Sequence, residues 1–391
     1  MVKPSIIFTT PVLEYPPIGG PRLRIANSIK ALSQVADLII YSRTSLTRVG
    51  GEKAVEYFKQ YSREFHFSPS VSGQASRWGL LSLWNDFADI KALAKKNQVE
   101  IIWLGYGNIS YGLAVILKLF SPYKVVIDTD SVWSRFVLRA IPYQKTFSGK
   151  FKSLYRGWKK RLQEFLGAKL ADITTAVSEF DAAYYRKFSR KVAVFSNVID
   201  LKDYNHPHKL ENVRMLYPAI YFSGSFGPGS AMEYAAIWLL KEVMPLVWHA
   251  NPAVNIYLVG RGNTDNLKKI SDPRVMITGE VPDTLPYVKT ADAAVVPLWF
   301  ESGTRFKILE AAACRTPVVS TTLGAEGLSV AHEKNILISD KPQGFADAIL
   351  KIIADKKLAQ QLSENAYHDI AEKFDISRAV KEAQQILMKL A

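Results

Sequence analysis

The chain has 391 residues, of which 48% are hydrophobic and 22% are charged, a composition typical of a folded protein with two domains. The one cysteine, Cys314, excludes an intramolecular disulfide, and no group of cysteines and histidines has the spacing of metal ligands. No run of about 18 apolar residues predicts a membrane-spanning helix, and the opening MVKPSIIFTTPVLEYPP is interpreted as a first strand, not a signal peptide.

The net charge of +14 is unevenly distributed along the chain. Residues 1–200 contain 29 Lys and Arg against 15 Asp and Glu, whereas residues 201–391 contain 21 of each kind. The whole excess therefore lies in the first half. This asymmetry predicts a polyanionic partner for that half, which can be nucleic acid, an anionic membrane or an acidic acceptor.

Short β-branched runs alternate with helix-length amphipathic segments along the chain. The runs that predict strands in the first half are 5–10, 37–42, 100–105, 124–129, 172–177 and 191–196. Those in the second half are 219–224, 255–260, 274–279, 292–297, 316–321 and 335–339. Continuous apolar runs of this length are typical of parallel strands buried on both faces.

Two such series indicate an α/β protein with two Rossmann-like, doubly wound parallel sheets. We place the first domain at 1–204 and the second at 205–375, because 201–215 is polar, contains proline and lacks a strand pattern. The segment 376–391 predicts an amphipathic helix beyond the second sheet. Because ligands of open α/β sheets bind at the carboxyl ends of strands, two such domains would hold a ligand in a cleft between them.

The stretch ESGTRFKILEAAACRTPVVST follows the strand predicted at 292–297. A helix is expected from about Thr304 to about Cys314, with Arg305 and Lys307 at its start and Glu310 one turn further in. Two cations are unfavourable at the positive end of a helix dipole unless an anion binds there, and a diphosphate fits best. The alternative is a solvated turn with an ion pair between Lys307 and Glu310.

This stretch resembles the donor-site signature, E-x7-E, of retaining family-4 glycosyltransferases, which have the GT-B fold. Glu310 matches the second glutamate, which the resemblance implies contacts the donor ribose. The first glutamate falls at position 302, where this chain has Ser302. Gly303, Thr304, Arg305 and Lys307 match a Gly-Thr-Arg-x-Lys variant of the motif.

Other segments resemble the family in the same order along the chain. YPPIGGPRLR at 15–24 is similar to the N-terminal glycine loop, so Gly19 and Gly20 would let the backbone approach the donor phosphates; a plain turn is the alternative. The loop SFGPGSAMEY carries no cation where family members usually have Arg and Lys, so we infer that Arg305 and Lys307 supply that charge. The resemblance implies that the C-terminal helix packs back on the first domain.

A further departure concerns the loop that faces the donor sugar. Family members often carry a histidine there, and the nearest match in VVIDTDSVW is Asp130, with Asp128 two residues before it. An aspartate can accept a hydrogen bond from a sugar hydroxyl, as histidine can. A simple turn at the end of a strand is the alternative.

The resemblance implies sugar transfer from a nucleotide-diphosphate sugar with retention of configuration. Asp130, Arg305 and Lys307 would be the catalytic residues, and the protein would orient the donor and stabilise the leaving diphosphate. No cofactor and no metal are expected, and the nucleotide sugar is a co-substrate.

Residues 131–163 contain nine Lys or Arg and no acid, with aromatic residues between them. Basic helices with aromatic residues bind anionic lipid surfaces, so this segment predicts a peripheral protein on the inner face of the cytoplasmic membrane with a glycan or lipid-linked acceptor. A solvated basic face that packs its aromatic residues into the core is the alternative. The residues assigned to this membrane and acceptor patch are Lys150, Lys152, Arg156, Trp158, Lys159, Lys160 and Arg161.

Three rival functions remain open from the sequence. A GT-B nucleotide-sugar epimerase or an inverting transferase would use a catalytic carboxylate or histidine, which we cannot place. A sugar-nucleotide binder without turnover is suggested by Ser302. A nucleic-acid-binding protein is disfavoured because only the high pI supports it.

Overall fold

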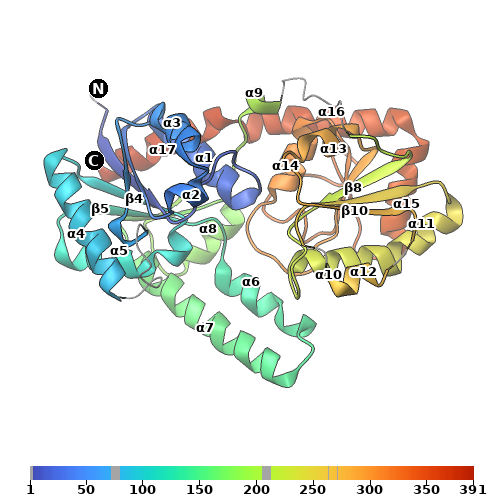
Figure 1. Ribbon diagram of the computed structural model, residues 1–391, viewed down its shortest axis with the longest axis horizontal. Helices are drawn as coiled ribbons and strands as arrows, with labels where there is room; N and C mark the ends of the chain where they lie inside the picture. The colour runs from blue at the N-terminus through green and yellow to red at the C-terminus, as the bar shows by residue number, and fades with distance from the viewer. Residues whose placement is uncertain (1–2, 72–79, 205–212, 263, 271) are drawn as a thin grey trace. The chain divides into compact units, whose positions relative to one another are not determined.

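The computed structural model describes residues 3–71, 80–204, 213–262, 264–270 and 272–391 (Figure 1). The chain divides into two compact units, Met1–Ile199 with Ile376–Ala391, and Asp200–Asp375. Part of the predicted linker, residues 205–212, lies outside the described residues.

Unit 1 contains a seven-stranded sheet in the order β3-β2-β1-β4-β5-β6-β7, and every neighbouring pair is parallel. Its strands are β1 (Ser5–Thr10), β2 (Asp37–Ser42), β3 (Glu64–Phe67), β4 (Ile101–Gly105), β5 (Lys124–Asp128), β6 (Ile173–Ala176) and β7 (Val192–Val194). Its helices are α1 (Gly20–Ser33), α2 (Leu46–Val49), α3 (Glu52–Lys59), α4 (Leu80–Lys96), α5 (Tyr111–Phe120), α6 (Trp133–Arg139), α7 (Phe147–Leu170), α8 (Glu179–Arg186) and α17 (Ile376–Leu390), with short 3₁₀ turns at η1 (Pro69–Val71), η2 (Gly107–Ile109) and η3 (Ile141–Tyr143).

Helices cover both faces of this sheet, and alternate residues of β1 point to opposite faces. Ile6 and Phe8 pack with α1 and α17 on one face, whereas Ile7 packs with α4 and α5 on the other. All three side chains are fully buried, and each such burial stabilises the fold by about 1.5–3 kcal/mol. This double burial is the reason for the continuous apolar pattern of the strand.

Unit 2 contains a six-stranded sheet in the order β10-β9-β8-β11-β12-β13, again with parallel pairs throughout. Its strands are β8 (Ala219–Ser223), β9 (Asn255–Val259), β10 (Val275–Gly279), β11 (Ala293–Val296), β12 (Val318–Ser320) and β13 (Leu337–Ile338). Its helices are α9 (Leu201–Tyr204), α10 (Ala231–Trp238), the π-helical η4 (Leu239–Val243), α11 (Met244–Ala250), α12 (Asp265–Lys268), α13 (Leu285–Thr290), α14 (Phe306–Ala313), α15 (Pro342–Ala354) and α16 (Lys356–Lys373).

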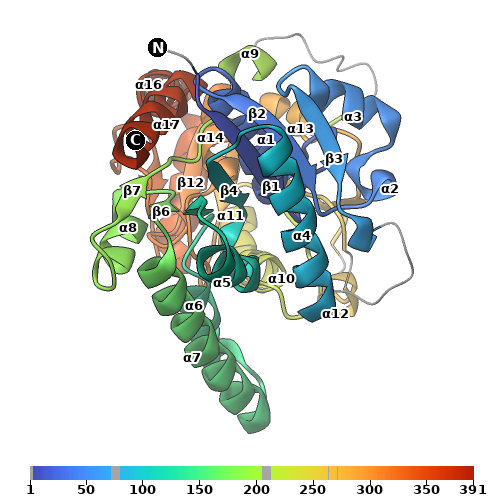
Figure 2. The same ribbon diagram turned by 90° about the vertical axis from the view of Figure 1, so that its left-hand side faces the viewer.

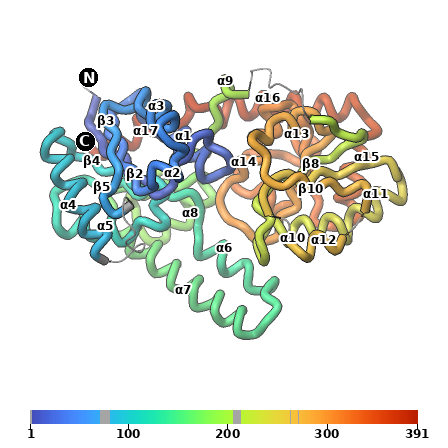
Figure 3. The backbone as a smooth tube through the Cα atoms, in the orientation of Figure 1, coloured from blue at the N-terminus to red at the C-terminus, as the bar shows by residue number. Residues whose placement is uncertain are grey.

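The last helix returns to unit 1 after the chain has completed unit 2. In Figure 3, α17 at the red end of the chain runs beside α1 at the blue end. Ala383 and Ile386 of α17 are buried in the same cluster as Ile25 and Ile29 of α1. Glu382 also accepts hydrogen bonds from the backbone N–H and the hydroxyl of Ser196, at 2.7 and 2.8 Å.

All twelve predicted strands are present, and within the described residues the sequence pattern missed one strand, β3. Its sequence EFHF alternates polar and aromatic residues, and all four residues are only partly buried at the edge of the sheet. The edge position explains the weak signal, because an edge strand does not need the continuous apolar run of a central one.

Candidate functional site

The strand order of each sheet fixes where a ligand can bind. The order reverses between β1 and β4 in unit 1, and between β8 and β11 in unit 2. In open parallel sheets, ligands bind outside the carboxyl ends of the strands at such a reversal. The glycine loop follows β1, Asp130 follows β5, and residues 303–310 follow β11, so every predicted donor or catalytic residue lies after the carboxyl end of a strand.

The strand, turn and helix predicted around Arg305 are present in unit 2. The chain leaves β11, turns at Gly303 with a φ of +83°, and enters α14 at Phe306. The helix thus begins two residues after the predicted start at Thr304, because Arg305 has extended backbone angles and caps the helix. Glycine is required at 303, since a positive φ strains other residues.

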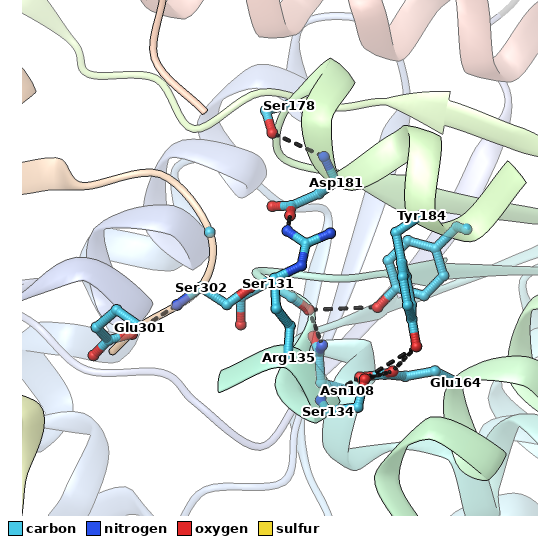
Figure 4. Close-up of polar contacts among 12 residues, drawn as sticks. Asn108, Ser131, Ser134, Arg135, Glu164, Ser178, Asp181, Tyr184, Glu301 and Ser302 are labelled. Carbon is cyan, nitrogen blue, oxygen red and sulfur yellow. Dashed lines mark hydrogen bonds and ion pairs between the residues drawn. The ribbon is translucent and has the colours of Figure 1, made fainter. Parts of the chain in front are cut away.

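The turn is buried, unlike the solvated turn of the alternative interpretation. Ser302, Thr304 and Arg305 are each only 7–8% exposed. Arg305 donates a hydrogen bond from Nη1 to the carbonyl of Gly303, and the backbone N–H of Ser302 donates to Glu301 Oε2 at 3.2 Å (Figure 4). The described first turn of α14 holds Lys307 and no acidic residue. An anion at this helix start would therefore meet two cations, the dipole and the first backbone N–H groups.

Glu310 lies one turn into α14, and its environment sets its charge. The hydroxyl of Tyr204 donates to Glu310 Oε1 at 3.5 Å. Burial and, to a lesser degree, Asp283 raise the pKa of Glu310 to about 7, against the opposing effects of Lys307 and Tyr204. Burial also lowers the pKa of Lys307, which Glu310 and Glu301 oppose. The carboxylate is therefore poised to titrate near neutral pH.

Tyr204 is a site residue that the sequence analysis missed, because it lies in a segment interpreted as a linker. It ends the short helix α9 and is only 7% exposed. An aromatic residue in an otherwise polar stretch was the available signal.

The loop after β8 is held by its own helix cap. Ser230 accepts a hydrogen bond from the backbone N–H of Glu233 at 3.1 Å, and Glu233 accepts one from the N–H of Gly229 at 2.6 Å. The Ser230 cap, together with the bond from the preceding residue to Glu233, fixes the start of α10 without any cation. The loop residues 224–230 hold no cation, and the assignment of the diphosphate charge to Arg305 and Lys307 stays a prediction.

In unit 1 the glycine loop begins helix α1. Gly19 has a φ of +85° and accepts hydrogen bonds at its carbonyl from the N–H groups of Arg22 and Leu23, each at 3.1 Å. A Cβ atom at Gly19 would meet nothing within 4 Å. The backbone angle, and not crowding, therefore requires glycine here, and the open space leaves the backbone of Gly19 accessible. Gly20 is the first residue of α1.

Arg24, one turn into α1, is a second residue that the sequence analysis missed. Its Nη2 atom forms an ion pair of 2.5 Å with Asp128 Oδ1, and its Nη1 atom donates to Asn197 Oδ1 at 2.8 Å. Nη2 also donates to the carbonyl of Phe195 at 3.1 Å, and Thr175 donates to Asp128 Oδ1 at 2.5 Å. The helix that carries the glycine loop is thereby joined to the ends of β5, β6 and β7.

Asp130 lies beside this cluster, and its charge depends on it. Its Oδ1 atom accepts from Trp133 Nε1 at 3.2 Å, and its N–H donates to Asn108 Oδ1 at 3.0 Å. Burial raises the pKa of Asp130 to about 6, and the nearby positive charge of Arg24 opposes this rise. The structure thus places Asp130 within the electrostatic reach of Arg24, which lies one turn beyond the glycine loop on α1.

The basic segment forms the helix pair α6 and α7. The N-terminal half of α7 extends beyond the helices that cover the sheet of unit 1 (Figures 1 and 2). The alternative interpretation, in which the aromatic residues of the basic segment pack into the core, holds for Trp133 of α6 but not for the exposed aromatic residues of α7. The large apolar side chains exposed along α7 are those of Phe147, Phe151, Leu154, Tyr155, Trp158, Leu162, Phe165 and Leu166.

Glycine allows the two helices to approach closely. A Cβ atom at Gly157 of α7 would lie 2.5 Å from the Leu138 side chain of α6. The exposed apolar side chains of α7 follow one another mostly at intervals of three and four residues, from Phe147 to Leu166, so they lie along one side of the helix. Among the described helices, none combines the length and apolarity needed to cross a bilayer.

Comparisons with known proteins agree with this geometry. Residues 217–355 match the family model of glycosyl transferases group 1. All of the matched residues lie in unit 2. The lipopolysaccharide core biosynthesis glycosyltransferase LpsE of Rhizobium meliloti is 33% identical over 131 residues, which are 32% of this chain and 38% of that protein. An uncharacterized 44.6 kDa protein in the cps region of Klebsiella pneumoniae is 26% identical over 44% of this chain and 46% of its own length. The chain therefore spans less than half the length of these curated relatives.

Solved structures show that the fold is GT-B. The sucrose-phosphate synthase of Thermosynechococcus elongatus has a TM-score of 0.74 at 18% identity and matches 99% of each chain. Anabaena HepE, solved in complex with UDP and glucose, has a TM-score of 0.68 at 17% identity, with 98% of each chain covered. WaaG, a glycosyltransferase involved in lipopolysaccharide biosynthesis, has a TM-score of 0.65 at 15% identity and covers 97% of this chain and 99% of its own.

The raised pKa of Glu310 predicts how stability depends on pH. Between its ordinary value of 4.5 and about 7, native Glu310 holds a proton that the unfolded chain has released. Its contribution to the free energy of unfolding therefore falls as pH rises through this window, by up to about 1.4 kcal/mol per pH unit. Glu310→Gln removes the titration, so the stability difference between the wild type and this variant should change from pH 5 to 7 and level off above it.

Denaturant unfolding of both proteins at pH 5, 6, 7 and 8 measures this difference. The exposed Glu372→Ala variant of α16 is the control, which should track the wild type at every pH. If the difference in unfolding free energy between wild type and Glu310→Gln were the same at every pH, the raised pKa of Glu310 would be contradicted.

Proposed function

We propose that the protein transfers a sugar, with retention of configuration, from a nucleoside-diphosphate sugar to a glycan acceptor carried on a membrane lipid. The observation that carries the proposal is the start of α14, where Arg305 and Lys307 meet a helix dipole with Glu310 one turn further in. This site lies after β11, at the reversal of strand order within the group 1 domain. LpsE and WaaG, which act in lipopolysaccharide synthesis by their names, support the class of acceptor.

Each proposed donor residue has a task that follows from its chemistry. Arg305 and Lys307 neutralise the diphosphate and stabilise it as it leaves, which is where negative charge grows during transfer. Glu310, when ionised, accepts hydrogen bonds from the ribose hydroxyls. Gly303 and Thr304 form the turn that brings the first N–H groups of α14 towards the phosphates.

The residues of unit 1 would act on the sugar and the acceptor side of the donor. The accessible backbone of Gly19, followed by Gly20 at the start of α1, would approach the donor phosphates, and Asp130 would accept a hydrogen bond from a hydroxyl of the transferred sugar. Transfer with retention needs no enzymic nucleophile when the donor phosphate itself accepts the acceptor proton on the same face. The proposal includes neither a metal nor a cofactor.

A sugar-nucleotide binder without turnover is the second candidate, and Ser302 favours it. The position is 7% exposed and holds a hydroxyl where a carboxylate would contact the transferred sugar. Both candidates predict nucleotide binding at α14. Formation of a glycosylated product from a radiolabelled nucleotide sugar separates them, because the binder would leave the sugar on its nucleotide.

We predict that one of UDP, GDP, CDP and ADP raises the melting temperature of the wild-type protein. A ligand present at about 100 times its dissociation constant adds about 2.7 kcal/mol of stability. Glu310→Ala removes the ribose acceptor, and Arg305→Gln removes a diphosphate cation, so each should reduce the shift. Glu372→Ala, which removes an exposed carboxylate in the same unit, should leave it unchanged.

Differential scanning fluorimetry with all four nucleotides gives the answer and identifies the base. If no nucleotide shifts the melting of the folded wild type, the donor site at residues 303–310 is wrong. If a nucleotide stabilises wild type and both variants equally, it binds elsewhere.

The membrane part of the proposal comes from the membrane and acceptor patch, whose residues all lie on α7. The exposed apolar stripe of α7 lies among cations, and residues 131–163 hold no acid. Self-association through this face would bring like charges together, whereas an anionic bilayer offers both opposite charge and an apolar interior. The cytoplasmic leaflet carries such anionic lipids, which favours a peripheral position on that face.

Neutralising the patch should release the protein from anionic vesicles. Each cation near the surface contributes roughly 1 kcal/mol, so Lys150→Gln, Lys152→Gln and Lys159→Gln together should lower vesicle affinity by about 100-fold. A triple variant at Lys53, Lys59 and Lys95, also exposed in unit 1, removes the same charge and should bind almost as well as wild type. Flotation with neutral and anionic vesicles measures the affinity of both variants. Equal losses of affinity in the two variants would show that only the net charge matters and would contradict a specific membrane-binding patch.

A further inference from the structure

A cavity of about 370 Å³ lies at the base of the α6 and α7 pair in unit 1. Its walls come from α6, α7 and α8, and none of its residues belongs to the proposed donor site. The residues that line it are Ser134, Arg135, Leu138, Arg139, Arg161 and Tyr184. This volume is at the lower end of the range for ligand pockets, so the cavity suits a small group or one end of a longer molecule.

The lining is strongly basic. Of the six described residues around the cavity, three are arginines and none is an acid. Arginine presents a planar fork of N–H donors that matches the oxygens of a phosphate, and such charge-assisted hydrogen bonds are stronger than neutral ones. The composition of the walls therefore favours a phosphate over a neutral sugar.

Two buried carboxylates stand behind the walls and hold them in place. Asp181 forms a 2.6 Å ion pair with Arg135 Nη1, and Figure 4 shows the guanidinium of Arg135 directed at that carboxylate. Glu164, only 1% exposed, accepts from the hydroxyl of Tyr184 at 2.6 Å. It also accepts from the hydroxyl and the N–H of Ser134, at 2.5 and 2.9 Å.

These contacts fix the positions of the side chains around the cavity. Glu164 uses its lone pairs on Ser134 and Tyr184, and Asp181 is engaged by Arg135, so the walls are fixed before any ligand arrives. Burial and the neighbouring Glu164 raise the pKa of Tyr184 well above its ordinary value, so its hydroxyl stays protonated and donates to Glu164, and Arg161 opposes this rise only weakly.

The surroundings of the cavity are apolar on the side of α7. Three apolar side chains of α7 near Arg161 in the sequence are exposed. They are Trp158 (57% exposed), Leu162 (58%) and Phe165 (37%). The guanidinium of Arg161 stacks on the ring of Trp158, 5.2 Å from its centroid. A phosphate in the cavity would thus be held beside an exposed apolar surface, which suits a ligand with both a charged head and a hydrocarbon chain.

We propose that this cavity binds the phosphate or diphosphate head of a lipid, with the hydrocarbon chain along the exposed stripe of α7. The identification of this lipid as the anchor of the glycan acceptor rests on the proposed sugar transfer. The binding itself is a property of unit 1 and can be measured without any transfer reaction.

Calorimetry with geranyl diphosphate tests the site on the full chain, with inorganic pyrophosphate and geraniol as partial probes. Geranyl diphosphate should bind at least about tenfold more tightly than either, because it alone uses both the arginines and the apolar stripe. Arg139→Gln with Arg161→Gln should weaken this binding by about tenfold or more. Lys53→Gln with Lys59→Gln removes the same charge from exposed positions of unit 1 outside the patch and should change it less than about threefold.

Three results would overturn the inference. Equal weakening in the two double variants would leave only diffuse electrostatic attraction, and equal affinities for pyrophosphate and geranyl diphosphate would indicate a free phosphate site. Absence of geranyl diphosphate binding by a wild-type protein that still responds to its nucleotide would sink the lipid site and leave the proposed transfer intact. Arg139→Lys with Arg161→Lys keeps the charge and should recover part of the affinity, which guards against a loss caused by misfolding.

Discussion

In a parallel sheet all strands end at the same edge, and the function proposed for this chain depends on that constraint in both units. The reversal of strand order between β8 and β11 separates the loops after these strands, and the turn at Gly303 occupies one of them. The same reversal between β1 and β4 serves the glycine loop of unit 1. The proposed chemistry would therefore depend on short segments that follow the strands of the two sheets.

Buried charge holds these segments in position. The ion pair of Arg24 and Asp128 is almost fully enclosed, with side chains 2% and 0% exposed. Removing one partner from such a pair leaves an uncompensated buried charge, which costs about 3–5 kcal/mol. This penalty ties the orientation of α1, and with it the glycine loop, to the ends of the central strands. In unit 2, burial does not fix a charged pair but raises the pKa of Glu310 to about 7, close to neutral pH.

Much of the fold could be predicted because buried parallel strands leave a strong pattern in the sequence. The strand 5–10 was predicted to the residue, whereas β3 was not found because its partly exposed edge does not need a continuous apolar run. The start of α14 was displaced by two residues, since the backbone of Arg305 is extended and not helical. The sequence pattern alone does not show where the helix begins, because the buried turn around Gly303 sets the backbone angles of Arg305.

Candidate site residues could be grouped from the sequence only where they lie close together in the chain. Arg305, Lys307 and Glu310 are close in the chain, so helical spacing was enough to group them. Arg24 and Asp128 are 104 residues apart, and Glu164 meets Ser134 across 30 residues, so only the fold brings these partners together. The exposed aromatic residues of α7 illustrate the same limit, because their spacing fits both a core-facing and a solvent-facing stripe.

Amide hydrogen exchange of the full chain, with and without the nucleoside diphosphate that binds best, tests the central claim most directly. The account predicts slower exchange in peptides that cover residues 303–310, where backbone N–H groups at the start of α14 would contact the phosphates, and in those covering the glycine loop at 15–24. Unchanged exchange in residues 303–310, with protection in another part of the chain, would contradict the donor site proposed here.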